Sequence, residues 1–454
     1  MRWAALLCAV GLAASTTSMP AVALAAEPPR VLPGPPPAGP VAPLQPTEQK
    51  AACAVAGVMP GSRFEQQLTG DAVLDYTAAW RFSRGAGQKV AVIDTGVARH
   101  PRLPRLEGGG DYVSNSDGLV DCDAHGTLVA GLIAGQASPT DTFAGVAPEA
   151  AVLSIRQNSA VYAPVGGPQG GPNSTSAGYG NTQTLAYAIV RAVDMGATVI
   201  NLSATACASA STDIDDAALG QAVRFAFERD VVVVAVAGNV SSDGLCAAQN
   251  DVRDPNRPLA DTWEAVRTVA SPAWFDDYVL SVGALTRDGR PADFSLRGPW
   301  VDVAAPGEAL ASLSPTGPGL MNAWLGPQGE LVPVNGTSFA APFVSGVVAL
   351  LRSRFPGMSA GEVMQRIERT SRTAKSGPDA ATGHGVIDPI AALTYELPDA
   401  ADRPPIDSGT ALTAAAPVGD GADRTSHYLM MSIVAGATAL TALTIAVARR
   451  RDGR

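Results

Sequence analysis

The segment Asn335-Gly336-Thr337-Ser338-Phe339-Ala340-Ala341-Pro342 leads straight into an apolar helical pattern. Gly336 permits a sharp turn, Thr337 is a candidate helix cap, and Pro342 is expected within about one turn of the helix start. Apolar residues then recur at helical spacing, at Val344, Val347, Val348 and Leu351. Ser338 is therefore predicted at the N-terminus of a buried helix, where backbone N–H groups and the helix dipole can stabilise an oxyanion.

Three upstream segments can supply the groups that a serine nucleophile needs. Residues 90–97 predict a short buried strand with Asp94 at its carboxyl end, the edge at which open α/β sheets hold their sites. The segment beginning at His125 predicts the start of a helix. Residues 231–237 predict another strand, and Asn239 after it offers an amide that could complete an oxyanion hole.

Helical and strand patterns alternate along most of the chain. Further strands are predicted at 151–155, 197–203, 278–284 and 301–304, and helices at 181–195, 214–229 and 359–370. This alternation predicts an α/β fold with a mostly parallel sheet covered by helices on both faces. Two Gly/Pro-rich segments, 158–180 and 314–332, are predicted to be long loops. The first could limit access to the site, dock a partner or be a variable surface insertion.

The four segments resemble the subtilisin-like serine proteases, whose catalytic residues follow the order Asp, His, Ser. The resemblance spans roughly Val90 to Leu393 and implies a subtilisin-like three-layer fold. It implies that Ser338 is the nucleophile, His125 the general base and then acid, and Asp94 the group that orients His125. Asn239 is the implied oxyanion donor.

The same resemblance implies that Ser203 and Ala204, at the edge of a strand, contact the substrate. Where that family continues with glycines, this sequence has Thr205-Ala206-Cys207. The width of the specificity pocket and the cleavage-site preference therefore stay open.

Both ends of the chain carry membrane-targeting patterns. Residues 1–25 resemble a secretory signal peptide with a small-residue cleavage site, and an uncleaved anchor is the alternative. Residues 428–448 form an uncharged run long enough to span a bilayer, and the tail 449–454 begins with three arginines, which predicts a cytoplasmic C-terminus. The chain is thus predicted to be a single-pass membrane protein with its catalytic domain outside the cytoplasm. A net charge of -10 argues against a nucleic-acid partner.

Four of the five cysteines remain once the signal peptide leaves with Cys8, and they allow three disulfide pairings. Closeness in sequence favours Cys207–Cys246, which leaves Cys53–Cys122. Zinc binding is the alternative, but no pair has C-x-x-C spacing.

Between the membrane signals the chain divides into three predicted parts. Residues 26–80 are a Pro-rich N-terminal extension, 81–396 the catalytic domain, and 397–427 a Pro/Ala/Asp-rich stalk. The extension could be a removable inhibitory propeptide. Because Cys53 lies in it, we instead expect a permanent segment wrapped on the catalytic domain.

Several other polar residues are given structural roles. His100 and His384 are predicted to lie in turns. Asp121 and Asp123, just before His125, could tune its pKa, but they are predicted to be solvated loop acids. No Asp-rich loop with the ligand spacing of a calcium site stands out, so no metal or other cofactor is expected. Asn239 and Asn335 each begin an N-glycosylation acceptor pattern, and glycans at these positions would obstruct the site. A host that does not glycosylate them, such as a bacterium, is therefore favoured.

The complete layout resembles the mycosins, the membrane-anchored proteases of actinobacterial type VII secretion systems. That resemblance implies secreted protein substrates and a type VII secretion membrane complex as partners. It leaves two functions open, a serine endopeptidase acting through an acyl-enzyme and a structural component of the complex in which proteolysis is secondary.

Overall fold

A computed structural model describes residues 26–397 except 168–169, 242–243, 251–262, 327 and 374–376. The predicted signal peptide (1–25), the transmembrane helix (428–448), the tail (449–454) and the stalk beyond Leu397 lie outside these residues. Within the described part, no helix combines the length and apolarity needed to cross a membrane. The described residues up to Tyr395 belong to one compact unit.

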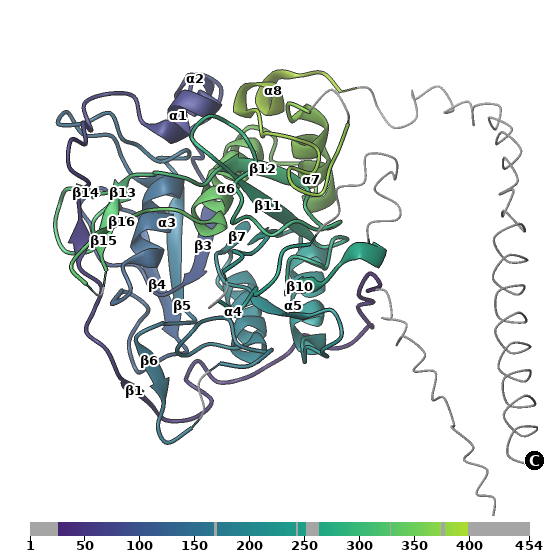
Figure 1. Cartoon of the computed structure of the whole chain (residues 1–454). Helices are drawn as coiled ribbons and strands as arrows, with labels where there is room; N and C mark the ends of the chain where they lie inside the picture. The colour runs from purple at the N-terminus through teal and green to yellow at the C-terminus, as the bar shows by residue number, and fades with distance from the viewer. Residues whose placement is uncertain are drawn as a thin grey trace, which may run out of the picture. The chain divides into compact units, whose positions relative to one another are not determined.

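A seven-stranded parallel sheet forms the centre of this unit (Figure 1). Its strands follow the order β12-β11-β9-β7-β3-β5-β4, and every neighbouring pair is parallel. The bounds are β3 Lys89–Asp94, β4 Leu106–Asp111, β5 Ala151–Arg156, β7 Val199–Leu202, β9 Val232–Val236, β11 Val279–Leu285 and β12 Val303–Pro306. The strands agree with the predicted ones, and β4 is an addition whose sequence, LEGGGD, has no apolar pattern.

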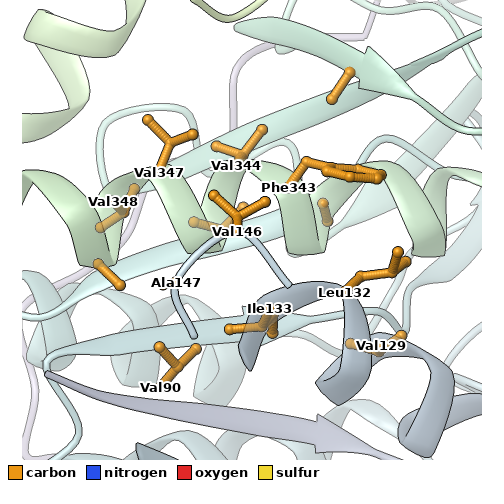
Figure 2. Packing of buried hydrophobic residues seen from close by; sticks show 14 of the residues in the cluster. Val90, Val129, Leu132, Ile133, Val146, Ala147, Phe343, Val344, Val347 and Val348 are labelled. Carbon is orange, nitrogen blue, oxygen red and sulfur yellow. The ribbon is translucent and has the colours of Figure 1, made fainter. Parts of the chain in front are cut away.

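Alternate residues of each strand bury opposite faces of the sheet. Val90 and Val92 of β3 pack with α3 (His125–Ala134) and α6 (Thr337–Arg354), whereas Ala91 and Ile93 pack with α4 (Thr182–Asp194) and α5 (Ala217–Glu228). Figure 2 shows the first of these layers, in which side chains of α3 and α6 meet those of the sheet. The three-layer α/β prediction is therefore correct.

Helix α6 lies in the middle of the first layer. All its residues from Thr337 to Arg352 are buried, between the sheet, α3 and the short helix α8 (Pro389–Thr394). Helix α7 (Ala360–Thr370) begins with the predicted capping box of Ser359 and Glu362. Two small helices from the N-terminal part of the chain, α1 (Thr69–Leu74) and α2 (Tyr76–Ala79), pack against this layer.

The two predicted long loops contain strands, which corrects that prediction. In the first, β6 (Tyr162–Pro164) pairs antiparallel with β1 (Thr47–Gln49) of the extension. In the second, β15 (Ala323–Leu325) pairs with both β16 (Leu331–Pro333) and β2 (Ala56–Gly57) of the extension. Two further antiparallel pairs are β8 (Ala206–Ser209) with β10 (Thr268–Ser271), and β13 (Ser312–Leu313) with β14 (Leu320–Met321). Loop composition concealed β6 and β15, whose partners in the extension are distant in sequence.

Candidate active site

Asp94 lies at the carboxyl end of β3, as predicted, and is 1% exposed. The chain turns sharply after it at Gly96, which has φ +100°. A Cβ atom at Gly96 would lie 2.2 Å from the carbonyl oxygen of Val120, so the turn requires glycine. The N–H of Thr95 donates to Asp94 Oδ1 at 2.7 Å and holds the carboxylate in place.

His125 is the first residue of α3, and its Nδ1 lies 2.7 Å from Asp94 Oδ1. The helix can come this close because residue 126 is glycine, since a Cβ there would lie 2.0 Å from the carbonyl oxygen of Gly96. The imidazole packs on the ring of Phe339, the residue after Ser338, with centroids 4.9 Å apart. With Nδ1 engaged by the carboxylate, Nε2 is the ring nitrogen left for a substrate or nucleophile.

Burial alone would lower the pKa of His125, but the nearby carboxylates outweigh it and raise that pKa. The largest raising cause is the charge and hydrogen bond of Asp94, and Asp121 and Asp123 add to it. The site therefore favours the imidazolium form, the charge that a general base acquires when it accepts a proton.

Asp121 and Asp123 were predicted to be solvated, and that prediction is wrong. Asp121 accepts hydrogen bonds from Thr95 Oγ1 (2.8 Å), Thr127 N–H (2.8 Å) and Thr127 Oγ1 (2.6 Å), and burial raises its pKa to about 7. Asp123 accepts from Ser159 Oγ and the N–H of Ala160, and burial raises its pKa too. Asp121 thus ties the end of β3 to the first turn of α3.

Ser338 lies in the first turn of α6 and is 8% exposed. The cap differs from the prediction, because Gly336 (φ 151°) is the N-cap and Thr337 is the first helical residue. The capping oxygen comes from another segment, since Asn239 Oδ1 accepts from Thr337 N–H at 2.9 Å and from Thr337 Oγ1 at 3.1 Å. Pro342 lies inside the helix, beyond the predicted position near its start.

Asn239, which follows β9, is exposed. Because its Oδ1 is engaged at the helix start, its Nδ2 points toward Gly336, where a Cβ would lie only 3.5 Å away. A side-chain N–H donor and the N-terminus of α6 thus lie together beside Ser338. This arrangement can stabilise a negative oxygen.

The Ser203 hydroxyl, predicted to lie in substrate binding, donates instead to the backbone carbonyl of Ser338 at 3.1 Å. It also accepts from Asn201 Nδ2 at 2.8 Å. Ala204 is 5% exposed. A backbone contact of either residue with a substrate stays a prediction.

The two other histidines among the described residues have partners away from this arrangement. His100 is buried and its Nδ1 accepts from the N–H of Arg102 at 3.1 Å, and burial lowers its pKa. His384 Nε2 lies 3.9 Å from Glu368 Oε2. No group of three His, Cys, Asp or Glu side chains in the described residues has a geometry that could hold a metal ion.

Sequence reasoning missed the supporting contacts of three residues around the site. Asp121 was considered as a group that could tune the pKa of His125, which it does. Its hydrogen bonds to Thr95 and Thr127 were missed because the spacing of these residues carries no pattern. Asn201 could have been found, because it is a lone amide inside an apolar strand and a buried polar group needs a partner. Ser345, two turns after Ser338 on α6, is that partner, and its Oγ lies 2.9 Å from Asn201 Oδ1.

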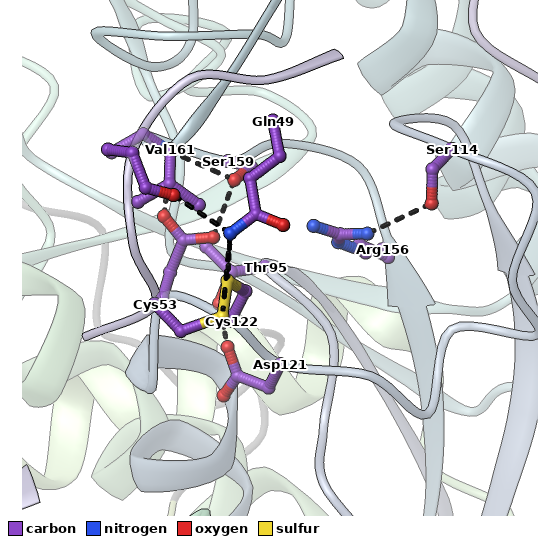
Figure 3. Close-up of a disulfide and its surroundings, with 12 residues drawn as sticks. Gln49, Cys53, Thr95, Ser114, Asp121, Cys122, Arg156, Ser159 and Val161 are labelled. Atoms are coloured by element: carbon purple, nitrogen blue, oxygen red, sulfur yellow. Dashed lines mark hydrogen bonds between the residues drawn. A yellow bond between two sulfur atoms is a disulfide. The ribbon is translucent and has the colours of Figure 1, made fainter. Parts of the chain in front are cut away.

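Both favoured disulfides are present, and one of them joins the extension to the site. Cys53 bonds to Cys122, close before His125, and Cys207 bonds to Cys246. Figure 3 shows the Cys53–Cys122 bond beside Gln49 and Asp121. The N–H of Ala54 donates to the carbonyl of Cys122 at 2.8 Å, so backbone contacts reinforce the link.

Comparisons with known proteins place this geometry in context. The model of the subtilase family matches residues 85–385. Mycosin-4 of Mycobacterium tuberculosis is 45% identical over 424 residues, which cover 90% of this chain and 88% of that protein. A solved structure of the MycP3 protease from the type VII (ESX-3) secretion system is 47% identical, with a TM-score of 0.76 over 82% of this chain and 100% of that one. A chain in the structure of an intact ESX-5 inner membrane complex is 41% identical, with a TM-score of 0.77 over 92% and 100% of the two chains.

Proposed function

The chain belongs to the subtilase family and, within it, to the mycosins, and from that premise we propose how its residues cleave exported proteins. It is a subtilisin-like serine endopeptidase. The observation that carries the assignment of residues is the 2.7 Å contact of Asp94 with His125, whose ring lies on the residue next to Ser338.

In the proposed reaction, Ser338 Oγ attacks the scissile carbonyl while His125 Nε2 accepts its proton. Asp94 keeps the proton of His125 on Nδ1 and stabilises the imidazolium. The tetrahedral oxyanion accepts hydrogen bonds from Asn239 Nδ2 and from an N–H at the start of α6. His125 then protonates the leaving amine, and the acyl-enzyme on Ser338 is hydrolysed by water that His125 activates in turn.

Ser203 and Ala204 border the substrate in this proposal through their backbone, because the Ser203 hydroxyl is engaged with Ser338. Specificity then depends on the pocket walls around residues 203–207, where β8 is fixed by the Cys207–Cys246 bond. The residues after β7 therefore set which polypeptides are cleaved.

The proposed setting is the outer side of the cell membrane. Residues 1–25 direct export, 397–427 form a stalk, 428–448 anchor the chain and 449–454 stay in the cytoplasm. The extension, residues 26–80, stays attached to the catalytic domain, 81–396. The similarity to a chain of the ESX-5 inner membrane complex supports a type VII secretion complex as the partner and exported proteins as substrates.

Labelling with a fluorophosphonate tests the catalytic assignment. The native protein should react at one serine, and Ser338→Ala should abolish the reaction while Ser353→Ala, on the same helix, should leave it unchanged. Labelling that persists in Ser338→Ala would refute the assignment.

A structural role in the secretion complex is the second candidate, and the similarity to a chain of an assembled membrane complex favours it. Secretion assays in cells separate the two functions. If secretion survives Ser338→Ala but stops when the whole chain is deleted, the structural role is separate from proteolysis.

A further inference from the structure

The backbone carbonyl of the proposed nucleophile cannot be satisfied by its own helix. Pro342 lies inside α6, four residues after Ser338, and proline has no N–H to donate to that carbonyl. Ser338 is 8% exposed, and a buried carbonyl without a partner is unfavourable. The carbonyl therefore needs a donor from outside the helix.

Ser203, which is 135 residues away in sequence, supplies that donor. Its Oγ lies 3.1 Å from the carbonyl oxygen of Ser338. Ser203 follows directly after β7, a central strand of the sheet, so the donor is attached to one of the most rigid parts of the domain.

Ser338, Ser203, Asn201 and Ser345 are linked by hydrogen bonds whose donors and acceptors can be assigned. A carbonyl only accepts, so the Ser203 hydroxyl donates to Ser338 and accepts from Asn201 Nδ2 at 2.8 Å. That orients the Asn201 amide with Oδ1 toward Ser345, whose hydroxyl donates to it at 2.9 Å. Asn201 and Ser345 are both 0% exposed. The hydrogen bonds thus run in one direction from α6 through β7 and back to α6.

We infer that Ser203 is a positioning residue for the nucleophile, a conclusion that rests on the proposed function of Ser338. Pro342 frees the first turn of α6 from the regular helical ladder, and Ser203 fixes that turn against the sheet. The hydroxyl of Ser203 acts on the enzyme's own backbone, so its removal impairs the chemical step and leaves substrate affinity nearly unchanged.

The first test compares Ser203→Ala with Ser203→Thr, which keeps a hydroxyl. Peptide hydrolysis gives kcat and KM, and fluorophosphonate inactivation gives its maximal rate and half-saturating concentration. Ser203→Ala should lower kcat and the inactivation rate roughly 10- to 100-fold, because small displacements of a nucleophile are that costly. KM should change by less than about twofold, and Ser203→Thr should recover most of the rate. The matched control is Ser353→Ala, which removes another serine-to-carbonyl bond of α6, to Ala86 at 2.9 Å, and should behave as the parent.

The second test asks whether the loss depends on the proline. In Pro342→Ala, residue 342 regains an N–H that can donate to the carbonyl of Ser338. Adding Ser203→Ala in that background should then lower kcat by less than about threefold, a strong coupling between the two changes. Thermal unfolding of every variant verifies that each protein is folded.

Three results would overturn the inference. The first is an equal loss of kcat from Ser203→Ala in the parent and in Pro342→Ala. The second is an effect of Ser203→Ala mainly on KM. The third is a Ser203→Thr variant that is as slow as Ser203→Ala. A parent protein that neither reacts with fluorophosphonate nor cleaves peptides would instead overturn the proposed function, and this inference with it.

Discussion

Replacing Asp121 with asparagine should change how the stability of this protein depends on pH. Burial raises the pKa of Asp121 from 3.8 to about 7 in the folded protein. Because the raised value favours the neutral acid, the folded state is most stable below about pH 4 and loses stability as pH rises toward 7. The gap of roughly 3 between the two pKa values corresponds to a total of about 4 kcal/mol.

Most of that loss falls in a range that is easily measured. Between pH 5 and pH 8, ionisation of Asp121 should lower the free energy of unfolding by about 2.5 kcal/mol. Asparagine cannot ionise, so Asp121→Asn should lack this part of the pH dependence. It also disturbs the bond with Thr95 Oγ1, at a cost of about 1 kcal/mol that does not vary with pH. The variant should therefore be less stable than the parent below about pH 4 and more stable at pH 8, with the two stabilities equal at about pH 4.5.

Urea unfolding of parent and variant at several pH values measures the difference. Asp117→Asn is the matched control, because it removes an exposed carboxylate from the same loop with the same change in net charge. Parallel stability curves for the parent and Asp121→Asn would refute the reasoning. Because Asp121 also raises the pKa of His125, the acid limb of activity should move to lower pH in the variant.

Three further predictions concern the site and its support. Asp94→Asn should lower kcat by about 10⁴-fold in peptide hydrolysis, since the preferred tautomer of His125 is lost. The acid limb of the pH–activity profile should also shift to lower pH. An unchanged acid limb would contradict the role of the 2.7 Å contact. Asn239→Ala should lower kcat by about 10²- to 10³-fold with KM nearly constant, and a change confined to KM would exclude the oxyanion role. Replacing both Cys53 and Cys122 with serine opens a loop of 69 residues. It should lower the free energy of unfolding, measured in urea titrations, by about 4 kcal/mol. An unchanged urea midpoint would show that attachment of the extension contributes little to stability.

The parts of the fold that could be predicted from sequence are those with local periodicity. Val90 to Ile93 alternate between two buried faces, and the apolar spacing of α6 reflects its place in the core, so strand and helix were both readable. Asp94, His125 and Ser338 were found because each stands at the end or start of such an element. The position of Asp94 follows from the general rule that parallel strands bring their carboxyl ends to one edge, whereas His125 and Ser338 lie at helix starts.

The features that escaped prediction depend on partners far away in sequence. The pairing of β2 with β15 joins a two-residue strand to a Gly/Pro-rich loop, and neither segment has a strand pattern by itself. Thr337 was predicted as a helix cap from residue preference, but the oxygen that accepts from the helix start belongs to Asn239, which follows β9. Asp121 was expected in solvent because polar composition says nothing about which loops are covered.

The arrangement of the extension has a consequence for how the protein matures. Because synthesis begins at the N-terminus, residues 47–57 are made early, but β6, Cys122 and β15, to which they attach, follow later in the chain. Contacts between such remote residues form slowly, because a long loop must close before they contribute. The extension is thus made early, but its native contacts can form only after the residues up to β15 have been made.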